Sequence, residues 1–375
     1  MVLMALDHCR DWFTNVTIDP VDIAQTWPAL FFTRWITHYC APAFVFLAGA
    51  GAYLYGARGR TKREISRFLF TRGLWLVFLE LTVVRFGWYF NLDYHYLGDA
   101  QVIWAIGWCM VALSALVYLP TRYVTAIGVT IIVLHNLLDG IAAKSLGDWS
   151  VLWMFIHEKG PIRPSPGYVL YLAYPVLSWI GVIAAGYGFG ALLTLETRLR
   201  RKLFLAIGPA IIAAFLLLRL TNLYGDMSKW STQPTALYTF MSFLNVTKYP
   251  PSLLYILMTL GPAITFLGIW TRPHGKLAQP FITFGRVPLF YYVLHLFLLH
   301  AMAATYSYVM FGTAAWLFQI PVSLDAMGGP QPKGYGVDLP MVYVFWVTAV
   351  LILYPFSKWF AEYKRTHSQT WLSYV

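Results

Sequence analysis

The sequence predicts an all-α integral membrane protein, a polytopic bundle of about ten transmembrane helices. Of its 375 residues, 59% are hydrophobic and only 11% are charged, and the mean hydropathy is +0.59. Soluble domains carry more charge, whereas a membrane-spanning helix needs about 20 largely apolar residues. No segment has the composition of a soluble domain. We therefore predict a single transmembrane domain over residues 1–375.

Ten segments approach or reach the length of a spanning helix. They cover residues 1–13, 36–56, 66–90, 101–119, 121–138, 168–193, 203–221, 250–270, 280–303 and 339–359. The first has only 13 residues before a polar loop. That gives roughly 20 Å of helix against a hydrocarbon core of ~30 Å. We therefore expect the cytoplasmic half of the first helix to lie upstream of Met1. The alternative is a half-span that is buried among other helices.

Basic residues predict which side of the membrane each loop occupies. One set of alternate loops, with the C-terminal tail, holds 16 of the 27 lysines and arginines, and the other loops hold 7. Loops rich in Lys and Arg resist translocation, so the richer side is predicted to be cytoplasmic. Both termini then face the cytoplasm, as an even number of spans requires. The net charge of +11 follows from this asymmetry and needs no nucleic-acid partner.

Other motifs exclude several classes of protein. Cys9, Cys40 and Cys109 lie at or within apolar segments without paired spacing, so neither a disulfide nor a metal site is predicted. The sequence contains no Walker loop, dinucleotide-binding fingerprint or zinc-binding helix motif. An ATP-driven pump and an ordinary dehydrogenase are therefore disfavoured.

Ionisable residues gather at the non-cytoplasmic ends of the predicted helices, where each is a functional candidate. The densest group ends the first helix, where His8 lies among Asp7, Arg10 and Asp11. A carboxylate beside an imidazole raises its basicity, so His8 is predicted to be a general base supported by Asp7 or Asp11. The alternative is an interfacial helix end whose charges simply meet water.

Several other helices contribute His, Arg and Asp at the same depth. Taken singly, each is more often a packing residue, but together they predict a polar cavity open to the outside and lined by Trp and Tyr. His38 and His295 are further candidates for proton transfer, and Arg34 or Arg85 for stabilising an oxyanion. The predicted substrate-binding residues are Arg10, Arg34, Arg85, the i,i+4 pair His135 and Asp139, Arg219, Asn222, Asp226 and Lys248.

Arginines of the cytoplasmic loops are candidates for binding a phosphate-rich donor such as coenzyme A, because guanidinium groups form forked hydrogen bonds to phosphate. The positive-inside rule explains the same arginines without any ligand. The predicted donor-binding residues are Arg58, Arg63, Arg72, Arg200 and Arg201.

Several segments resemble known membrane acyltransferases. Met1–His8 resembles the end of their first-helix motif. A bacterial membrane-protein family related to heparan-α-glucosaminide N-acetyltransferase is similar over Thr33–Gly49, Tyr174–Gly181, Asn222–Asp226, Phe243–Leu254, Gly285–His295 and Trp371–Tyr374. The resemblance implies a multi-pass acyltransferase of the bacterial inner membrane. Such an enzyme moves an acetyl or other acyl group from cytoplasmic acyl-CoA to a sugar on the far side.

The resemblance also implies a role for His8, which falls where related sugar O-acyltransferases place an essential histidine and the heparan enzyme an asparagine. The heparan enzyme carries its reactive histidine in the first outer loop, but Thr14–Thr33 contains no histidine here. A ping-pong route through an acyl-histidine in that loop is therefore unavailable. His38 lies near a position where the family has an aspartate, so it is no obvious replacement.

Two other function classes stay open. A transporter or flippase for a polar or lipid-linked solute predicts polar groups at mid-membrane and broken helices in related halves, whereas these polar residues cluster outward and no internal repeat is found. A non-catalytic membrane scaffold predicts that the buried His and Arg are dispensable. The expected partners are the lipid bilayer and a sugar or glycan acceptor, with acetyl-CoA as donor and a homodimer left open.

Overall fold

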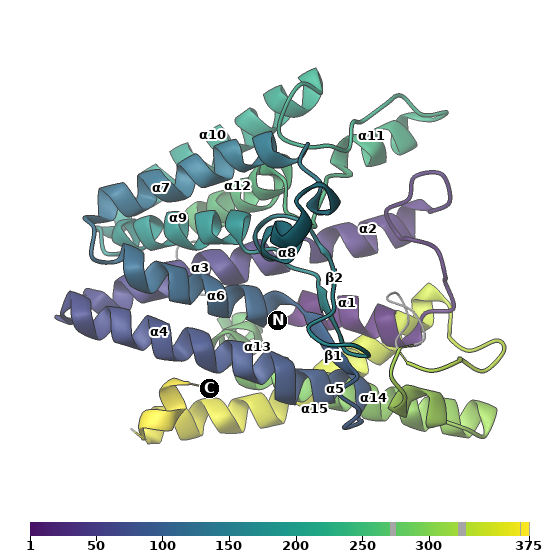
Figure 1. The fold of residues 1–375 in the computed structure, drawn as a ribbon. Coiled ribbons are helices and arrows are strands. Elements are labelled where there is room, and N and C mark those ends of the chain that lie inside the picture. The colour runs from purple at the N-terminus through teal and green to yellow at the C-terminus, as the bar shows by residue number, and fades with distance from the viewer. Residues whose placement is uncertain (271–274, 322–327, 368, 375) are drawn as a thin grey trace.

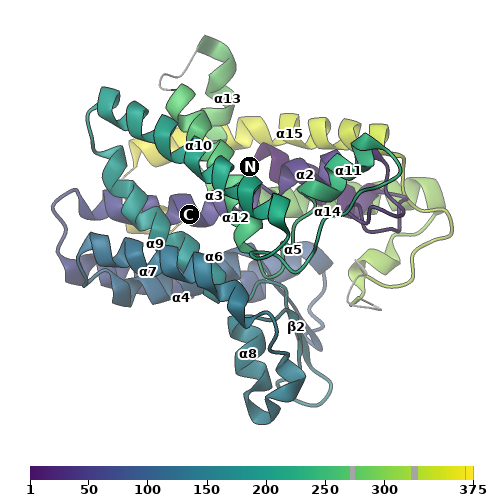
Figure 2. The ribbon, with the colours of Figure 1, turned by 90° about the horizontal axis from the view of Figure 1, so that it is seen from above.

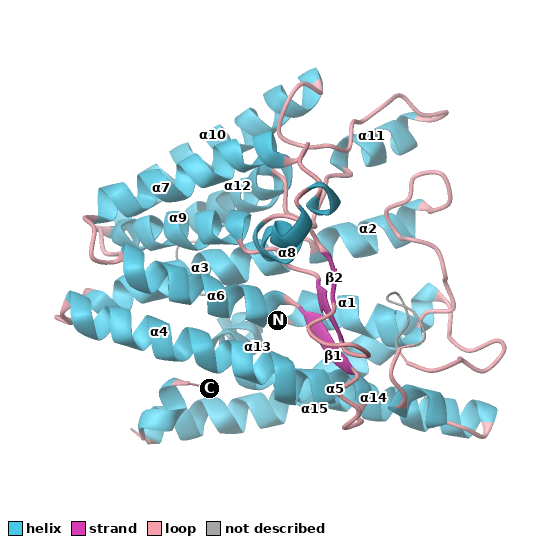
Figure 3. Ribbon diagram, viewed as in Figure 1, coloured by secondary structure: helices cyan, strands magenta, loops and turns pink. Residues whose placement is uncertain are grey.

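The computed structural model describes residues 1–270, 275–321, 328–367 and 369–374. Helices account for nearly all of the regular structure in these ranges (Figure 3). Within these ranges, five helical segments are long and apolar enough to cross a membrane. They are α2 with α3 (Pro28–Thr37 and Cys40–Gly56), α7 with the turn that follows it (Thr121–Leu134, extended to Leu138), α10 (Thr197–Thr221), α14 (Pro288–Phe311) and α15 (Leu339–Thr366). The predicted all-α membrane bundle is confirmed.

The remaining helices complete the bundle. Three shorter apolar ones are α6 (Val102–Leu116), α9 (Leu177–Leu193) and α12 (Leu253–Ile269). The others are α1 (Val2–Phe13), α4 (Lys62–Leu79), α5 (Arg85–Tyr89), α8 (Ser150–Ile156), α11 (Ala236–Leu244) and α13 (Gly275–Arg286). A π-helical turn, Glu80–Val84, joins α4 to α5. Each of the ten predicted segments overlaps at least one of these helices.

The long helices run side by side, with their connections at two ends of the molecule (Figure 1). The short α3–α4, α6–α7 and α9–α10 connections lie together at one end, on the left of Figure 1. These connections belong to the loop set that is rich in Lys and Arg. The strands, α8, α11 and the longer loops lie toward the other end, and α8 projects from the side of the bundle in Figure 2.

Prolines account for two boundaries that the sequence prediction placed wrongly. The second segment begins at Pro28 instead of residue 36, because proline is favoured at the first position of a helix. The segment predicted as 280–303 is two helices that meet at Val287, with Pro288 opening α14. Proline has no N–H to donate, so it ends the preceding helix and starts the next one.

A small sheet was not predicted. It contains β1 (Tyr96–Ala100), β2 (Gly160–Ile162) and β3 (Val169–Leu172) in the order β1-β3-β2. Strand β3 pairs in parallel with β1 and antiparallel with β2. The start of the segment predicted as 168–193 is therefore strand, and helix α9 begins only at Leu177. Strands of three to five residues leave too little periodicity for a sequence to reveal them.

Glycines allow neighbouring helices to approach at backbone distance. A Cβ on Gly73 of α4 would lie 2.5 Å from the carbonyl oxygen of Gly107 in α6, and a Cβ on Gly107 would lie 2.7 Å from that of Gly73. Small residues at such crossings increase van der Waals contact, which drives helix association in lipid.

Helix α1 lies inside the bundle, and its packing fixes the position of His8. Phe13 stacks on Phe345 of α15 with ring centroids 4.1 Å apart. At the other end of α1, the Trp346 indole N–H donates to the carbonyl of Val2 at 2.8 Å. Both ends of α1 are thereby held against α15.

Candidate functional site

The polar group predicted at the end of α1 forms a compact ionic cluster. Arg34 from α2 and Arg10 both donate to the Asp7 carboxylate, Arg10 at 3.3 Å. Arg10 also donates to Asp11 at 2.6 Å. Asp7 and Arg10 are each only 9% exposed. Two cations therefore balance two carboxylates in a largely buried place, so each charge depends on the others.

His8 pairs with another histidine instead of a carboxylate. Its Nδ1 lies 2.7 Å from Nε2 of His295 in α14. Asp7 and Asp11, the residues predicted to support His8, are bound by the arginines of the cluster. His8 is half-buried, whereas His295 is fully buried. The imidazole predicted as the base is thus the accessible member of the pair.

The hydrogen bonds of this pair determine which nitrogen of His8 is free. Nδ1 of His295 lies 3.2 Å from the carbonyl oxygen of Tyr291, which can only accept a hydrogen bond. With both rings neutral, His295 carries its proton on Nδ1, so its Nε2 accepts a hydrogen bond from Nδ1–H of His8. Nε2 of His8 is left with an available lone pair. This is the protonation state that a general base requires.

Aromatic side chains enclose His8. The Trp88 ring in α5 lies 5.0 Å from the His8 ring and meets it edge-on, and the Tyr292 ring in α14 lies 6.5 Å away. Trp12 stacks on Trp88 with centroids 4.4 Å apart. Sequence reasoning missed Trp88 and Tyr292. The available signal for Tyr292 was its position three residues before His295, which places both on one face of a helix.

Lys248 and Arg34 converge on Tyr249, on the α2 and α12 side of the cluster. The Lys248 Nζ lies 5.1 Å from the centroid of the Tyr249 ring. Burial acts to raise the pKa of Tyr249, but Lys248 and Arg34 outweigh it and hold that pKa below its ordinary value. His38 is buried nearby, where its carbonyl accepts a hydrogen bond from Tyr255 at 2.7 Å. Lys248 stays a candidate for substrate contact, and His38, whose Nδ1 has no partner within the described residues, stays a candidate for proton transfer.

Two predicted substrate-binding arginines are occupied by backbone carbonyls. Arg85 donates to the carbonyls of Asn91 and Asp93 and to the side chain of Asn91 in the loop that precedes β1, and to the carbonyl of Tyr96 at the start of β1. Arg219 donates to four carbonyls of the α10–α12 connection, those of Ser228, Ser242, Phe243 and Asn245. These contacts hold the loop before β1 and the α10–α12 connection in place.

Asn222 and Asp226 organise the same α10–α12 connection. Asn222 caps the C-terminal end of α10 with a backbone φ of 53°. Its side-chain amide donates a hydrogen bond to the carbonyl of Trp230 and accepts one from the backbone N–H of Trp230. The Asp226 carboxylate accepts hydrogen bonds from Ser228, Thr247 and Ser252. The structure therefore gives both residues contacts within the loop and places neither against His8.

The predicted pairing of His135 with Asp139 is wrong. Nε2 of His135 lies 2.9 Å from the carbonyl oxygen of Pro251, and Asp139 instead contacts His157 Nε2 at 3.0 Å. The chain turns into a 3₁₀ helix at His135, so the α-helical i,i+4 geometry is lost. Burial acts to raise the pKa of Asp139, but hydrogen bonds from His157 and Asn136 outweigh it and leave the pKa lowered.

This lowered pKa predicts a pH-dependent effect of Asp139→Asn. An aspartate whose folded pKa is depressed stabilises the protein above its unfolded pKa of about 3.9, and this contribution is lost as the pH falls through the folded value. We expect the wild type to have a higher Tm than Asp139→Asn at pH 6 and the difference to shrink by pH 3. Thermal unfolding of both proteins at the two pH values measures this. A difference that grows on acidification would contradict it.

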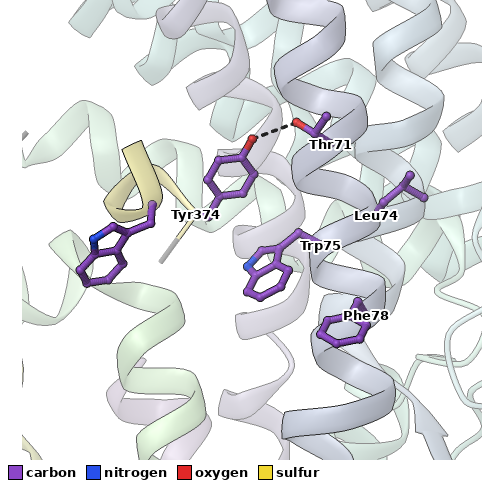
Figure 4. A pocket seen from close by; sticks show the side chains of 6 residues that line it. Thr71, Leu74, Trp75, Phe78 and Tyr374 are labelled. Carbon is purple, nitrogen blue, oxygen red and sulfur yellow. Dashed lines mark hydrogen bonds between the residues drawn. The ribbon is translucent and has the colours of Figure 1, made fainter. Parts of the chain in front are cut away.

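Two pockets lie along α4, away from His8. One has a volume of about 510 Å³ and is apolar, and Tyr374 from the C-terminal segment reaches the Thr71 hydroxyl at 3.1 Å beside it (Figure 4). The second has a volume of about 530 Å³ and is lined by Thr61, Arg63, Glu64, Ser66, Arg67, Phe70 and Tyr118. Of the five predicted donor-binding arginines, Arg63 lines the second pocket, and the other four line neither of the two. A cavity around His8 stays a prediction.

The family model described as heparan-alpha-glucosaminide N-acetyltransferase, catalytic, matches residues 1–222. The matched part contains His8 and Arg34, whereas His295 lies beyond it. Comparison with curated proteins and with solved structures gave no match. Because the matched part is more than half of the chain, this protein belongs to the heparan-α-glucosaminide N-acetyltransferase catalytic family of transmembrane acyltransferases.

Proposed function

We propose that this protein transfers an acetyl or other acyl group from cytoplasmic acyl-CoA to a sugar or glycan on the opposite side of a bacterial inner membrane. The observation that carries the proposal is the free Nε2 of half-buried His8. The hydrogen bonds of His295 place the proton of the His8 ring on Nδ1 and leave Nε2 unprotonated. A base beside a reacting hydroxyl or amine is what acyl transfer to a sugar requires. Membership of an acyltransferase family supports the same reaction.

His8 acts at two stages of the proposed reaction. The acceptor oxygen or nitrogen attacks the thioester carbonyl carbon while its proton passes to Nε2 of His8. The tetrahedral intermediate then breaks its C–S bond. The departing coenzyme A thiolate takes the proton from His8, so the reaction ends with free thiol, acylated acceptor and a neutral imidazole. Nδ1–H of His8 stays bonded to His295 throughout, which keeps the ring oriented.

The distribution of charge supports the proposed sidedness. The basic connections α3–α4, α6–α7 and α9–α10 gather at one end of the bundle (Figure 1). Under the positive-inside rule this end faces the cytoplasm, with both termini on the same side. The pocket lined by Arg63 and Arg67 belongs to α4, just after the first of these connections. Two guanidinium groups one helical turn apart suit the phosphates of coenzyme A.

Proteoliposomes test the reaction and its direction together. The purified protein is reconstituted with radiolabelled acetyl-CoA on one side and a mixture of amino sugars and oligosaccharides on the other, with protein-free liposomes as control. The proposal predicts label in the sugar fraction that depends on the protein. Accumulation of unmodified sugar across the membrane, without labelled product, would instead show a transporter. Absence of both would also contradict the proposal.

A further inference from the structure

We propose that the Trp88 indole N–H and the Tyr292 hydroxyl form the oxyanion-binding site of this reaction, beside His8. This assignment rests on the proposed acyl transfer. In the attack step, the π electron pair of the thioester carbonyl moves onto its oxygen. The two donors would stabilise that negative charge until the carbonyl reforms and the C–S bond breaks.

Both donors are buried and unused. Trp88 is 6% exposed and Tyr292 is 2% exposed. Within the described part of the chain, neither Nε1 of Trp88 nor Oη of Tyr292 has a hydrogen-bond partner. Buried donors are normally paired, because leaving one unpaired forfeits its hydration without any return. Other buried donors of the chain, such as the Trp104 indole, are unpaired as well, but Trp88 and Tyr292 lie beside the imidazole of His8, where a bound ligand can accept both hydrogen bonds.

Both donors lie beside the proposed base. The Trp88 ring meets the His8 ring at an interplanar angle of 67°, with the ring centroids 5.0 Å apart. The Tyr292 ring meets the His8 ring at 75°, with the centroids 6.5 Å apart. The two residues come from different helices, α5 and α14. The proposal therefore places the carbonyl oxygen of the bound thioester beside His8, between these two helices.

Both donors are held in position before any substrate binds. Trp88 stacks on Trp12 at an interplanar angle of 17°. The preceding carbonyl, that of Gly87, lies 3.2 Å from Nδ1 of His300, which anchors α5 to α14. Tyr292 lies on the same helix as His295, the partner of His8. Fixed donors need no reorganisation when charge develops, which is the source of their catalytic effect.

Arg34 and Arg85, the arginines predicted for this role, already have partners. Arg34 is bound to Asp7, and Arg85 donates to the loop that precedes β1. Trp88 and Tyr292 have no such partner within the described residues, so they are the donors available beside His8.

Conservative variants test the assignment. Trp88→Phe and Tyr292→Phe each remove one donor and keep an aromatic ring. We expect each variant to lower kcat for acyl transfer by about 10²-fold, with little change in the KM for acetyl-CoA, because the lost contact exists only in the transition state. Both variants should also bind a tetrahedral phosphonate analogue of the acyl donor more weakly than the wild type does.

Matched controls come from other helices. Trp104 in α6 is 7% exposed and its indole N–H is also unpaired within the described residues, and Tyr187 in α9 is 3% exposed. Trp104→Phe and Tyr187→Phe should keep the wild-type kcat. Wild-type kcat and analogue affinity in Trp88→Phe and Tyr292→Phe would overturn the assignment. If Trp88→Phe proves unstable by Tm, Tyr292→Phe alone decides. Failure of the proposed acyl transfer would be distinguishable from failure of this assignment, because the wild type itself would then form no product.

Discussion

Replacing His8 by alanine is expected to lower kcat for acyl transfer by about 10²- to 10⁴-fold, the usual contribution of a general base. The reason is that Nε2 of His8 is the available proton acceptor of a histidine pair whose other hydrogen bonds are fixed. Single-turnover and steady-state rates with acetyl-CoA measure the effect. His95→Ala is the matched control, because His95 is exposed and contacts Asp93 in the loop that precedes β1.

The His295 partner refines this prediction. His295→Gln keeps a hydrogen-bond acceptor for Nδ1–H of His8, whereas His295→Leu removes it. We expect the glutamine variant to be more active than the leucine variant, and the leucine variant to show an altered pH–rate profile because the tautomer of His8 is no longer fixed. Equal rates and identical pH profiles in the two variants would show that His295 has only a packing role.

Asp7→Asn is expected to produce the largest loss of stability. Asp7 lies between Arg10 and Arg34 in a largely buried cluster, so the substitution leaves two cations without their shared carboxylate. Removing one partner of a buried ion pair costs about 3–5 kcal/mol. Thermal unfolding of the detergent-solubilised protein should show a clearly lower Tm.

A second substitution checks this explanation. Asp7→Asn combined with Arg34→Gln also removes one of the two cations that Asp7 neutralises, so the double variant should be more stable than Asp7→Asn alone. Asp148→Asn, at an exposed position, should leave the Tm nearly unchanged. A normal Tm for Asp7→Asn, or no recovery in the double variant, would mean that the ionic cluster does not hold α1 in place.

The sequence predicted the bundle well because long apolar runs dominate it. Where prediction of the fold was wrong, local chemistry explains the error. Pro28 and Pro288 set helix starts that hydropathy alone does not show. The strands β1 to β3 were missed because they are short and one of them pairs across some 70 intervening residues.

In the candidate site too, contacts set by local spacing could be predicted, whereas contacts between distant parts of the chain could not. The contact between Asp7 and Arg10 follows from helical spacing, and sequence reasoning found it. The contact between His8 and His295 joins positions 287 residues apart, so no local pattern reveals it. Trp88 and Tyr292 were indistinguishable from packing residues in a chain that is 18% aromatic. The loop contacts of Arg85 and Arg219 depend on backbone geometry that exists only after folding.

The most direct test of the central claim is a mass balance. Purified wild type and His8→Ala are incubated with acetyl-CoA and the pool of amino sugars and glycans, and mass spectrometry quantifies free coenzyme A and acetylated acceptor. The account predicts one acetylated acceptor for each coenzyme A released by the wild type, and almost none of either from His8→Ala. Equal turnover by the two proteins, or loss of acetyl-CoA without an acetylated acceptor, would contradict it.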